Sequence, residues 1–352
     1  MKRIDEIAGR ICEIDPVIIQ KAQKRLDNLT KPLGSLGRLE ELARQVCGIT
    51  AKLGPALKNK VIFTLAADHG VTEEGVSAYP KEVTAQMVYN FLSGGAGINV
   101  LAAHAGARVV VADLGVCVEL KPNPKLLVKK INYGTKNMAK GPAMAREEAI
   151  RSICAGFEIF ENEYEKGIDI AGTGEMGIGN TTAASAITAC FTKKSIEEIT
   201  GRGAGLDDKG LNNKIAVIKK SLALNNPDPL DPVDVLAKVG GFEIGGLAGI
   251  ILASAARKVP VVIDGFISGA AALIAYRLEP KVKEYMIAAH CSVESGHKFI
   301  LEHIGLRPLL DLNLRLGEGT GGALAIALAD AAVKILTQMA TFQSANVSEK
   351  NK

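Results

Sequence analysis

The segment with the clearest capacity for chemistry is Leu314–Gly322, in which Glu318 stands as a lone carboxylate among four glycines. Glycine lets the backbone adopt positive φ and come close to a ligand, whereas each glycine weakens a helix or strand by about 0.5–1 kcal/mol. Such a segment disfavours a helix or a strand and is well suited to a binding or catalytic site. The alternative is a tight turn before a helix, in which Glu318 only favours the helix dipole. This segment alone leaves both interpretations open.

A second glycine-rich segment, Gly172–Thr182, follows an apolar run and opens an Ala-rich stretch that we expect to be helical, with Asn180 as N-cap. Free N–H groups at a helix start bind phosphate. The segment also satisfies the Gly-x-Gly-x-x-Gly pattern of dinucleotide-binding folds, which requires a second strand and an acidic residue about 20 positions on. Residues 193–198 offer glutamate but no convincing strand. A mononucleotide phosphate site is therefore favoured, and glycines that serve close strand–helix packing remain the third interpretation.

The remaining polar candidates are weaker. No P-loop pattern occurs, and Asp207 and Asp208 follow glycines instead of an apolar strand, unlike the acidic pair that grips magnesium pyrophosphate. Lys214 lies at the edge of the apolar face of a predicted helix over 211–222, where a surface lysine is the usual explanation. The segment His290–His297 places hydroxyls and histidines at a predicted strand end, and a turn explains it as well. Nothing in the sequence requires a metal or another cofactor.

These residues need elements to position them, and five short runs supply the expected strands. Each run is mostly apolar, as in strands covered on both faces, and each ends at a polar residue or a glycine. The runs are 61–67, 108–112, 168–171, 259–263 and 285–289, and the residues that follow them are Asp68, Asp113, Gly172, Asp264 and His290. Helical patterns separate the runs, so we expect an α/β fold with an open parallel sheet flanked by helices, similar to a Rossmann fold. Ligands of such sheets bind beyond the carboxyl ends of the strands.

Both ends of the chain differ from this alternation. Helical patterns over 18–29, which begin shortly after a predicted N-cap at Asp15, and over 39–49 have no strand between them. With a helix predicted over 323–336, they are expected to form a small helical domain. We therefore predict two domains, a large α/β domain over 58–319 and a small helical domain made of 1–57 and 320–352.

Composition narrows the class of protein. The 352 residues are 47% hydrophobic, enough to bury a large core, and the net charge of +4 is not gathered into a polybasic tract. We therefore expect no nucleic-acid partner. The start lacks the apolar stretch of a signal peptide, and the apolar runs are too short to span a membrane, so we expect a cytoplasmic protein without a membrane partner. The six cysteines are widely spaced and show no zinc-site pattern.

Seven segments, taken in order, resemble the nicotinate-nucleotide:dimethylbenzimidazole phosphoribosyltransferase family of cobalamin lower-ligand synthesis. They are 31–40, 67–71, 94–99, 172–182, 201–208, 264–266 and 314–322, and they are spread over nearly the whole chain. Single glycine motifs are weak signals, but this ordered set is specific. The resemblance implies a homodimer whose subunits have a parallel-sheet domain and a small helical domain, with the site at the carboxyl ends of the strands.

The reaction implied by the resemblance moves 5-phosphoribose from nicotinate mononucleotide to 5,6-dimethylbenzimidazole or a related base. The products are α-ribazole 5′-phosphate, inverted at C1′, and nicotinate. The pyridinium leaves as an aromatic heterocycle without needing a metal or an acid. The attacking benzimidazole nitrogen becomes cationic as its bond forms, so a carboxylate that accepts the proton of the other ring nitrogen removes that charge. The family's base matches Glu318.

The resemblance also implies roles for the other site residues. Glu175 and Lys214 match charged residues that assist near the reacting ribose. The phosphoribosyl- and nucleotide-binding positions match Gly177, Asn180, Thr181, Gly203, Asp264 and Ser292, and the wall of the base pocket matches Gln86, Met176, Leu316 and Ser77. The chain has no Trp, so apolar side chains or peptide planes must stack on the base, which leaves room for other benzimidazoles or phenols.

Two other classes of function stay open. A non-catalytic nucleotide-binding homologue would use the same phosphate loops, although the joint presence of Glu318, Glu175 and Lys214 argues against it. A nicotinamide-dependent oxidoreductase would prefer NAD to the mononucleotide, and the missing acidic residue after a second strand argues against that class. The expected partners are thus nicotinate mononucleotide and a benzimidazole-type base.

Overall fold

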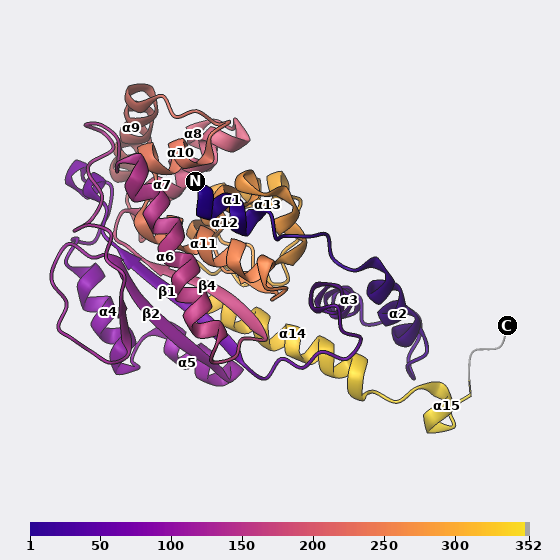
Figure 1. The fold of residues 1–352 in the computed structure, drawn as a ribbon. Helices are drawn as coiled ribbons and strands as arrows, with labels where there is room; N and C mark the ends of the chain where they lie inside the picture. Colours follow the sequence, from indigo (N-terminus) through magenta and orange to yellow (C-terminus); the bar gives the residue numbers. More distant parts are fainter. Residues whose placement is uncertain (349–352) are drawn as a thin grey trace.

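The computed structural model describes residues 1–348, which form an α/β fold around a six-stranded sheet (Figure 1). All six strands are parallel, as predicted, in the order β3-β2-β1-β4-β5-β6. They are β1 (Lys60–Ala67), β2 (Ala107–Gly115), β3 (Leu126–Val128), β4 (Ile170–Met176), β5 (Val261–Ile263) and β6 (Met286–Ala288). From β1 the chain adds β2 and then β3 on one side of β1. It then adds β4, β5 and β6 in turn on the other side. In doubly wound sheets, ligands bind at such a reversal, beyond the carboxyl ends of the strands.

Helices cover both faces of the sheet, which explains why the strands carry so few polar side chains. Successive side chains of a strand point to opposite faces, and β1 divides accordingly. Val61, Phe63 and Leu65 belong to one hydrophobic core. Ile62 and Ala66 belong to the other. The first core is closed by α6 (Arg146–Tyr164), α7 (Asn180–Thr192), α11 (Phe242–Ala256) and α12 (Phe266–Leu278), and the second by α4 (Val83–Ser93), α5 (Gly97–Ala105) and α14 (Thr320–Gln338).

Eight further helices and two 3₁₀ turns complete the described chain. They are α1 (Lys2–Ala8), α2 (Pro16–Asp27), α3 (Arg38–Thr50), η1 (Gly70–Glu74), α8 (Ile196–Ile199), α9 (Asp208–Asn225), α10 (Pro232–Val239), η2 (Pro280–Tyr285), α13 (Gly296–Ile304) and α15 (Phe342–Ala345). Side-chain caps begin α2 and α9, and the cap at Asp15 is the predicted one. Asp15 accepts hydrogen bonds from the N–H groups of Val17 and Ile18, and Asp207 accepts one from Gly210.

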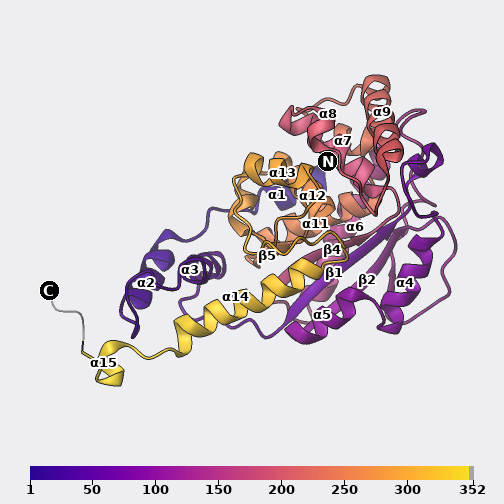
Figure 2. The same cartoon turned by 180° about the vertical axis from the view of Figure 1, so that it is seen from behind.

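Helices α2 and α3 and the end of α14 form an arm that projects from the body containing the sheet (Figures 1 and 2). α2 packs on α3, and α14 packs on both. Helix α1 lies against α6 and α11 of the body. The division into domains over 58–319 and over 1–57 with 320–352 stays a prediction, and its last four residues, 349–352, lie outside the described part of the chain.

Two strands differ from the prediction. β3 has three residues, too few to carry a periodic signal, and is absent from the predicted set. β4 continues through Gly172 and Gly174 to Met176, whereas the sequence predicts a loop from Gly172 onward. Glycine belongs in this strand because other backbone packs on it: a Cβ at Gly174 would lie 2.1 Å from the carbonyl oxygen of Glu318. The next strand begins only at Val261, which agrees with the argument against a dinucleotide-binding pattern.

Among the described residues, one helix, α14, has the length and apolar composition to cross a membrane, and 56% of its most apolar window is buried inside the fold. It packs on α3, α5 and β4. Burial in the core of the fold therefore accounts for its apolar character.

Glycines let α6 and α11 approach until their backbones touch, and this contact predicts a stability effect. A Cβ at Gly156 would lie 2.0 Å from the carbonyl oxygen of Gly246, and one at Gly249 would lie 2.1 Å from that of Ile153. We expect Gly156→Ala to lower the free energy of unfolding by about 2–3 kcal/mol through overpacking, although alanine is the better helix former by about 1 kcal/mol. Urea denaturation measures the change. Gly141→Ala, whose added Cβ would meet open space, is the control, and equal stability of both variants would contradict the prediction.

Candidate active site

Glu318 lies beyond the carboxyl ends of the strands, on the loop that leads into α14. Its φ is 63°, in the left-handed region, and only 4% of the residue is exposed. Oε2 accepts a hydrogen bond of 3.0 Å from the N–H of Ile98 in the first turn of α5, and the backbone carbonyl accepts one of 2.9 Å from Oγ1 of Thr64. The carboxylate is thus held by α5, and the dipole of α14 alone does not explain the position of the Glu318 side chain. A buried residue kept at positive φ by long-range contacts is typical of functional sites.

Glu175, at the end of β4, is the second buried carboxyl group of this region. A Cβ at Gly317 would lie 2.3 Å from Oε1 of Glu175, so the side chain packs directly against the backbone of the Glu318 loop. Its Oε2 accepts a hydrogen bond from the amide of Asn180. Burial raises the pKa of Glu175 to about 8, helped by the charge of Asp264. Glu175 therefore carries a proton at neutral pH and can donate it in a hydrogen bond.

Burial also raises the pKa of Glu318 above its usual range. The hydrogen bond from Ile98 opposes that rise, and the charge of Asp264 adds to it. A carboxylate with a raised pKa is a stronger proton acceptor in its ionised form, provided that the pH keeps it ionised. The site can therefore combine a protonated carboxyl with a basic one.

The loop between β4 and α7 provides backbone groups for an anion. A Cβ at Gly177 would lie 2.4 Å from the carbonyl oxygen of Ala67, so only glycine lets this loop pass over the end of β1. The N–H of Ile178 donates to Oγ1 of Thr84 in α4 at 3.1 Å, which ties the loop to that helix. The prediction of Asn180 as N-cap is wrong: the N-cap of α7 is Gly179, Asn180 is the first residue of the helix, and among the described residues no side chain caps it. The N–H groups of Asn180 and Thr182 donate to the carbonyl oxygens of Gly177 and Gly179 at 3.1 and 3.0 Å. The N–H of Thr181, between them, is the donor of this first turn that a phosphate can use.

Lys214 is fully buried, which corrects the expectation of a surface lysine. Its ammonium donates to Oγ1 of Thr181 at 2.7 Å and to the carbonyl oxygen of Gly201 at 3.3 Å. Burial lowers its pKa to about 8, and the charge of Glu294 opposes that fall. Lys214 is thus still largely protonated at neutral pH, and a buried ammonium is a strong partner for a phosphate.

A cavity of about 390 Å³ lies beside these groups, lined by residues of the 200–205 loop, the 293–295 turn and Arg315. Gly203 has a φ of 55°, and its carbonyl oxygen accepts a hydrogen bond of 3.2 Å from Arg315. Oγ of Ser292 donates to the carbonyl oxygen of Leu314 at 3.2 Å. The loops expected to bind phosphoribose are therefore hydrogen-bonded to the segment that carries Glu318.

Asp264 lies beneath the Glu318 loop and does not line this cavity. Its Oδ2 accepts a hydrogen bond of 3.2 Å from the N–H of Gly319, and its Oδ1 accepts one of 2.9 Å from that of Gly322. Burial raises its pKa, and His290, at 3.7 Å, opposes the rise. Its carboxylate thus anchors the start of α14. This geometry favours a positioning role over the direct nucleotide contact that the resemblance implies.

The four residues expected to line the base pocket come from different elements. Leu316 is 60% exposed, and its Cδ2 would lie 2.9 Å from a Cβ at Gly97. Met176 is half-buried and packs against the second core. Gln86 is exposed on α4, and Ser77 accepts a hydrogen bond from the N–H of Tyr79 at 3.1 Å. Among residues 1–348, no hydrogen bond joins Gln86 or Ser77 to Glu318, so their roles stay predictions.

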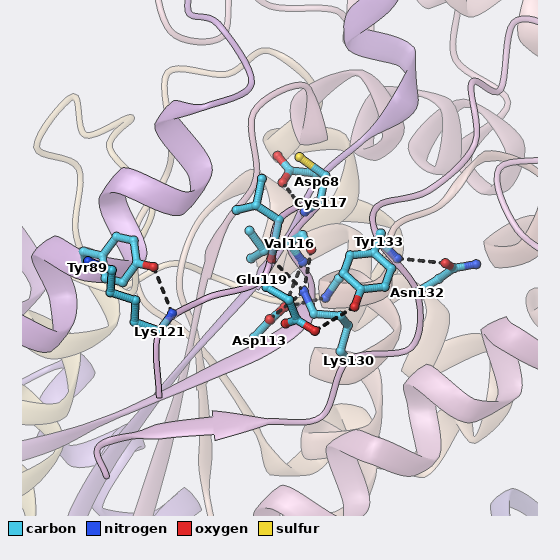
Figure 3. Close-up of polar contacts among 12 residues, drawn as sticks. Asp68, Tyr89, Asp113, Val116, Cys117, Glu119, Lys121, Lys130, Asn132 and Tyr133 are labelled. Carbon is cyan, nitrogen blue, oxygen red and sulfur yellow. Dashed lines mark hydrogen bonds and ion pairs between the residues drawn. The ribbon is translucent and has the colours of Figure 1, made fainter. Parts of the chain in front are cut away.

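Two residues at predicted strand ends, Asp68 and Asp113, bind the segment that follows β2 (Figure 3). Oδ2 of Asp68 accepts a hydrogen bond of 2.8 Å from the N–H of Cys117. Asp113 accepts one of 2.8 Å from the N–H of Val116 and pairs with Lys130 at 2.8 Å. Both carboxylates thus hold the segment that follows β2.

The sequence does not predict the contacts that three further residues of this region make. His69 and Glu243 form a buried pair at 2.7 Å, with His69 packed below Gly177. Burial lowers the pKa of His69, but the charge and hydrogen bond of Glu243 raise it above its usual value. Glu294 accepts a hydrogen bond of 2.9 Å from the N–H of Gly203. Each partner is far away in sequence, so no local pattern marks these pairs.

The contact between β4 and the Glu318 loop gives a second prediction. We expect Gly174→Ala to lower turnover by about ten- to a hundredfold, because its Cβ would push against the carbonyl oxygen of Glu318 and displace the side chain. Steady-state kinetics measure the loss. In the control, Gly172→Ala, the nearest atoms are flexible side-chain ends of Ile326 and Ile62 at 3.1 and 3.3 Å. The prediction fails if both variants keep the parent turnover.

Comparisons with known proteins agree with this arrangement. The phosphoribosyltransferase family model DBI_PRT matches residues 11–347. The nicotinate-nucleotide–dimethylbenzimidazole phosphoribosyltransferase of Geobacter sulfurreducens is 56% identical over 349 residues, with 99% of each chain covered. That of Desulforudis audaxviator is 58% identical over 340 residues, covering 97% of this chain and 96% of its own.

A solved structure supports the same relationship. The enzyme of that name from Thermus thermophilus superposes with a TM-score of 0.91 at 45% sequence identity, covering 96% of this chain and all of that one. Identity at this level over the whole fold extends well beyond a shared architecture. The chain belongs to the nicotinate-nucleotide–dimethylbenzimidazole phosphoribosyltransferase family.

Proposed function

We propose that this protein transfers 5-phosphoribose from nicotinate mononucleotide to 5,6-dimethylbenzimidazole, giving α-ribazole 5′-phosphate and nicotinate with inversion at C1′. The placement of Glu318 carries the proposal. Its buried carboxylate is held at positive φ beyond the carboxyl ends of the strands, between α5 and the loops that can bind a phosphate. The names of the relatives support the same pair of substrates.

The nucleotide half of the site binds the phosphoribose. Lys214 supplies a buried positive charge, and the N–H of Thr181 in the first turn of α7 supplies a neutral donor. The cavity beside Gly203 accommodates the sugar phosphate. Protonated Glu175 is placed to donate a hydrogen bond towards the ribose.

The chemical step forms one bond to C1′ and breaks another. A ring nitrogen of the benzimidazole attacks C1′, and the bond from C1′ to the pyridinium nitrogen breaks, with its electron pair leaving on nicotinate. The attacking ring would become cationic, and Glu318 accepts the proton of its second nitrogen. The neutral product base then remains attached to the ribose with inverted configuration.

The base half of the site selects the acceptor mainly by shape. Leu316 and Met176 are aliphatic walls, and Gln86 and Ser77 complete the set that we propose around the base. Such walls place flat rings by packing and discriminate only modestly between related bases.

We also propose a homodimer, because the arm of α2 and α3 projects from the body and leaves Leu33 74% exposed. Light scattering measures the molar mass in solution and so tests whether the protein is a dimer.

One assay tests the reaction. The pure protein is incubated with nicotinate mononucleotide and 5,6-dimethylbenzimidazole, benzimidazole or phenol, and products are identified by mass, with the anomeric proton coupling giving the configuration at C1′. We expect nicotinate release and an α-ribotide. Binding of the nucleotide without nicotinate release on addition of any base would instead favour the non-catalytic homologue.

A further inference from the structure

Glu294, on the turn between β6 and α13, is a buried carboxylate at the nucleotide cavity. Only 6% of the residue is exposed. Oε1 accepts the hydrogen bond from Gly203, and Oε2 lies so close to Gly201 that a Cβ there would be 2.4 Å away. Among residues 1–348, Oε2 has no hydrogen-bond partner. The negative charge therefore lies directly on the 201–205 loop with little compensation by hydrogen bonds.

Lys214 holds the same loop with the opposite charge. The ammonium binds the carbonyl oxygen of Gly201, and the carboxylate of Glu294 binds the N–H of Gly203. The two buried charges thus fix neighbouring peptide groups of one loop. Glu294 also favours the charged form of Lys214, since its charge opposes the fall in the pKa of Lys214 that burial causes.

The position of Glu294 is itself fixed from its own turn. Its N–H donates to Oγ of Ser292 at 3.3 Å, and its carbonyl oxygen accepts a bond of 2.9 Å from the N–H of His297. Nδ1 of His297 accepts the N–H of Ser292 at 3.0 Å. Burial lowers the pKa of His297 to about 3, helped by His290, so this ring stays a neutral acceptor at working pH.

The other charged groups around the loop lie at its outer side. Arg202 is half exposed and pairs with Asp208, and Arg315 donates to the carbonyl oxygen of Gly203. Both arginines keep their charge throughout the working range of pH. Lys214 and Glu175 both have a pKa of about 8, but Glu175 contacts Asn180 and Gly317 and not the 201–205 loop. A pH response of the loop itself in the neutral to alkaline range therefore comes from Lys214.

We infer that Glu294 is a positioning residue for the nucleotide: its carboxylate, together with the ammonium of Lys214, holds the 201–205 loop in its binding conformation. The inference rests on the proposed function in one respect, that the nucleotide is nicotinate mononucleotide. The residue acts through the loop and through Lys214 and makes no contact with the reacting atoms.

Two substitutions separate the effect of the Glu294 charge from that of its hydrogen bond to Gly203. Glu294→Gln keeps an oxygen that can accept from Gly203 but removes the charge, so the alkaline loss of affinity for nicotinate mononucleotide should begin about one pH unit lower than in the parent. Glu294→Ala also removes the acceptor, and the dissociation constant should rise by about ten- to a hundredfold, while KM for the base stays unchanged. Calorimetry across pH 6 to about 9.5 spans the range in which Lys214 titrates.

Glu302→Gln is the control, because it removes an exposed carboxylate from α13, the helix that follows the turn with Glu294. Thermal melting checks that each variant folds. The titration of Lys214 can also be followed without ligand, by NMR of the lysine Cε resonance that disappears in Lys214→Met. The inference would be overturned if the titration midpoint followed by that resonance were unchanged in Glu294→Gln. It would also be overturned if folded Glu294→Ala kept the parent affinity for the nucleotide. Failure of the wild-type protein to form a ribotide would overturn only the proposed function.

Discussion

Glu318→Gln is expected to lower turnover by about 10²–10⁴-fold, the usual contribution of a placed general base, and to leave the affinity for nicotinate mononucleotide unchanged. Glutamine has the shape of glutamate and retains an oxygen that can accept the hydrogen bond from Ile98, which glutamate makes at 3.0 Å. It cannot take up the proton of the benzimidazole. In the proposed function the nucleotide binds through Lys214 and its loops, which this change does not touch.

The pH dependence of kcat/KM for the base tests whether Glu318 is the proton acceptor. Because burial raises the pKa of Glu318, kcat/KM for the base should fall in the wild-type protein as the pH drops through that raised value. The residual activity of Glu318→Gln should lack this acid limb. Asp311→Asn, which alters an exposed carboxylate earlier in the same segment, serves as the control. Near-normal turnover of Glu318→Gln would refute the assignment of Glu318 as the base.

Lys214→Met is expected to lower kcat/KM for nicotinate mononucleotide by about 10²–10³-fold, the loss that accompanies removal of one strong, placed donor. The methionine fills most of the volume but brings no charge to the phosphate. It also leaves Oγ1 of Thr181 and the carbonyl oxygen of Gly201 without the ammonium that both contact. Wild-type affinity should itself weaken as the pH rises through about 8, since the burial of Lys214 places its pKa there.

Lys220→Met provides the matched control, because Lys220 is an exposed lysine on the same helix, α9. Calorimetric titration with nicotinate mononucleotide and steady-state kinetics give the two measurements. We expect the control to bind and react as the parent does. Equal nucleotide affinity in Lys214→Met and in the parent protein would rule out the proposed phosphate contact.

The sequence determines the features that depend on neighbouring residues. Apolar runs with polar ends predict a parallel sheet covered on both faces, and five of the six strands lie where such runs occur. Asp15 and Asp207 cap their own helices, so their roles are visible within a few residues. Gly317 and Gly319, on either side of Glu318, mark a loop, whereas Gly321 and Gly322 lie in the first turn of α14. The ordered set of motifs indicates the family.

The tertiary structure decides what the groups in those segments touch. Lys214 has the sequence pattern of a surface lysine but is buried, because the 201–205 loop and α7 close over it. β4 runs on through Gly174 because the Glu318 backbone packs on that glycine from 144 positions away (318 − 174). Asp264 holds the start of α14 across 58 positions, and Glu294 holds Gly203 across 91. Periodicity and capping act over a few residues along the chain, whereas burial, pKa and ligand geometry depend on which distant segments the folded sheet brings together.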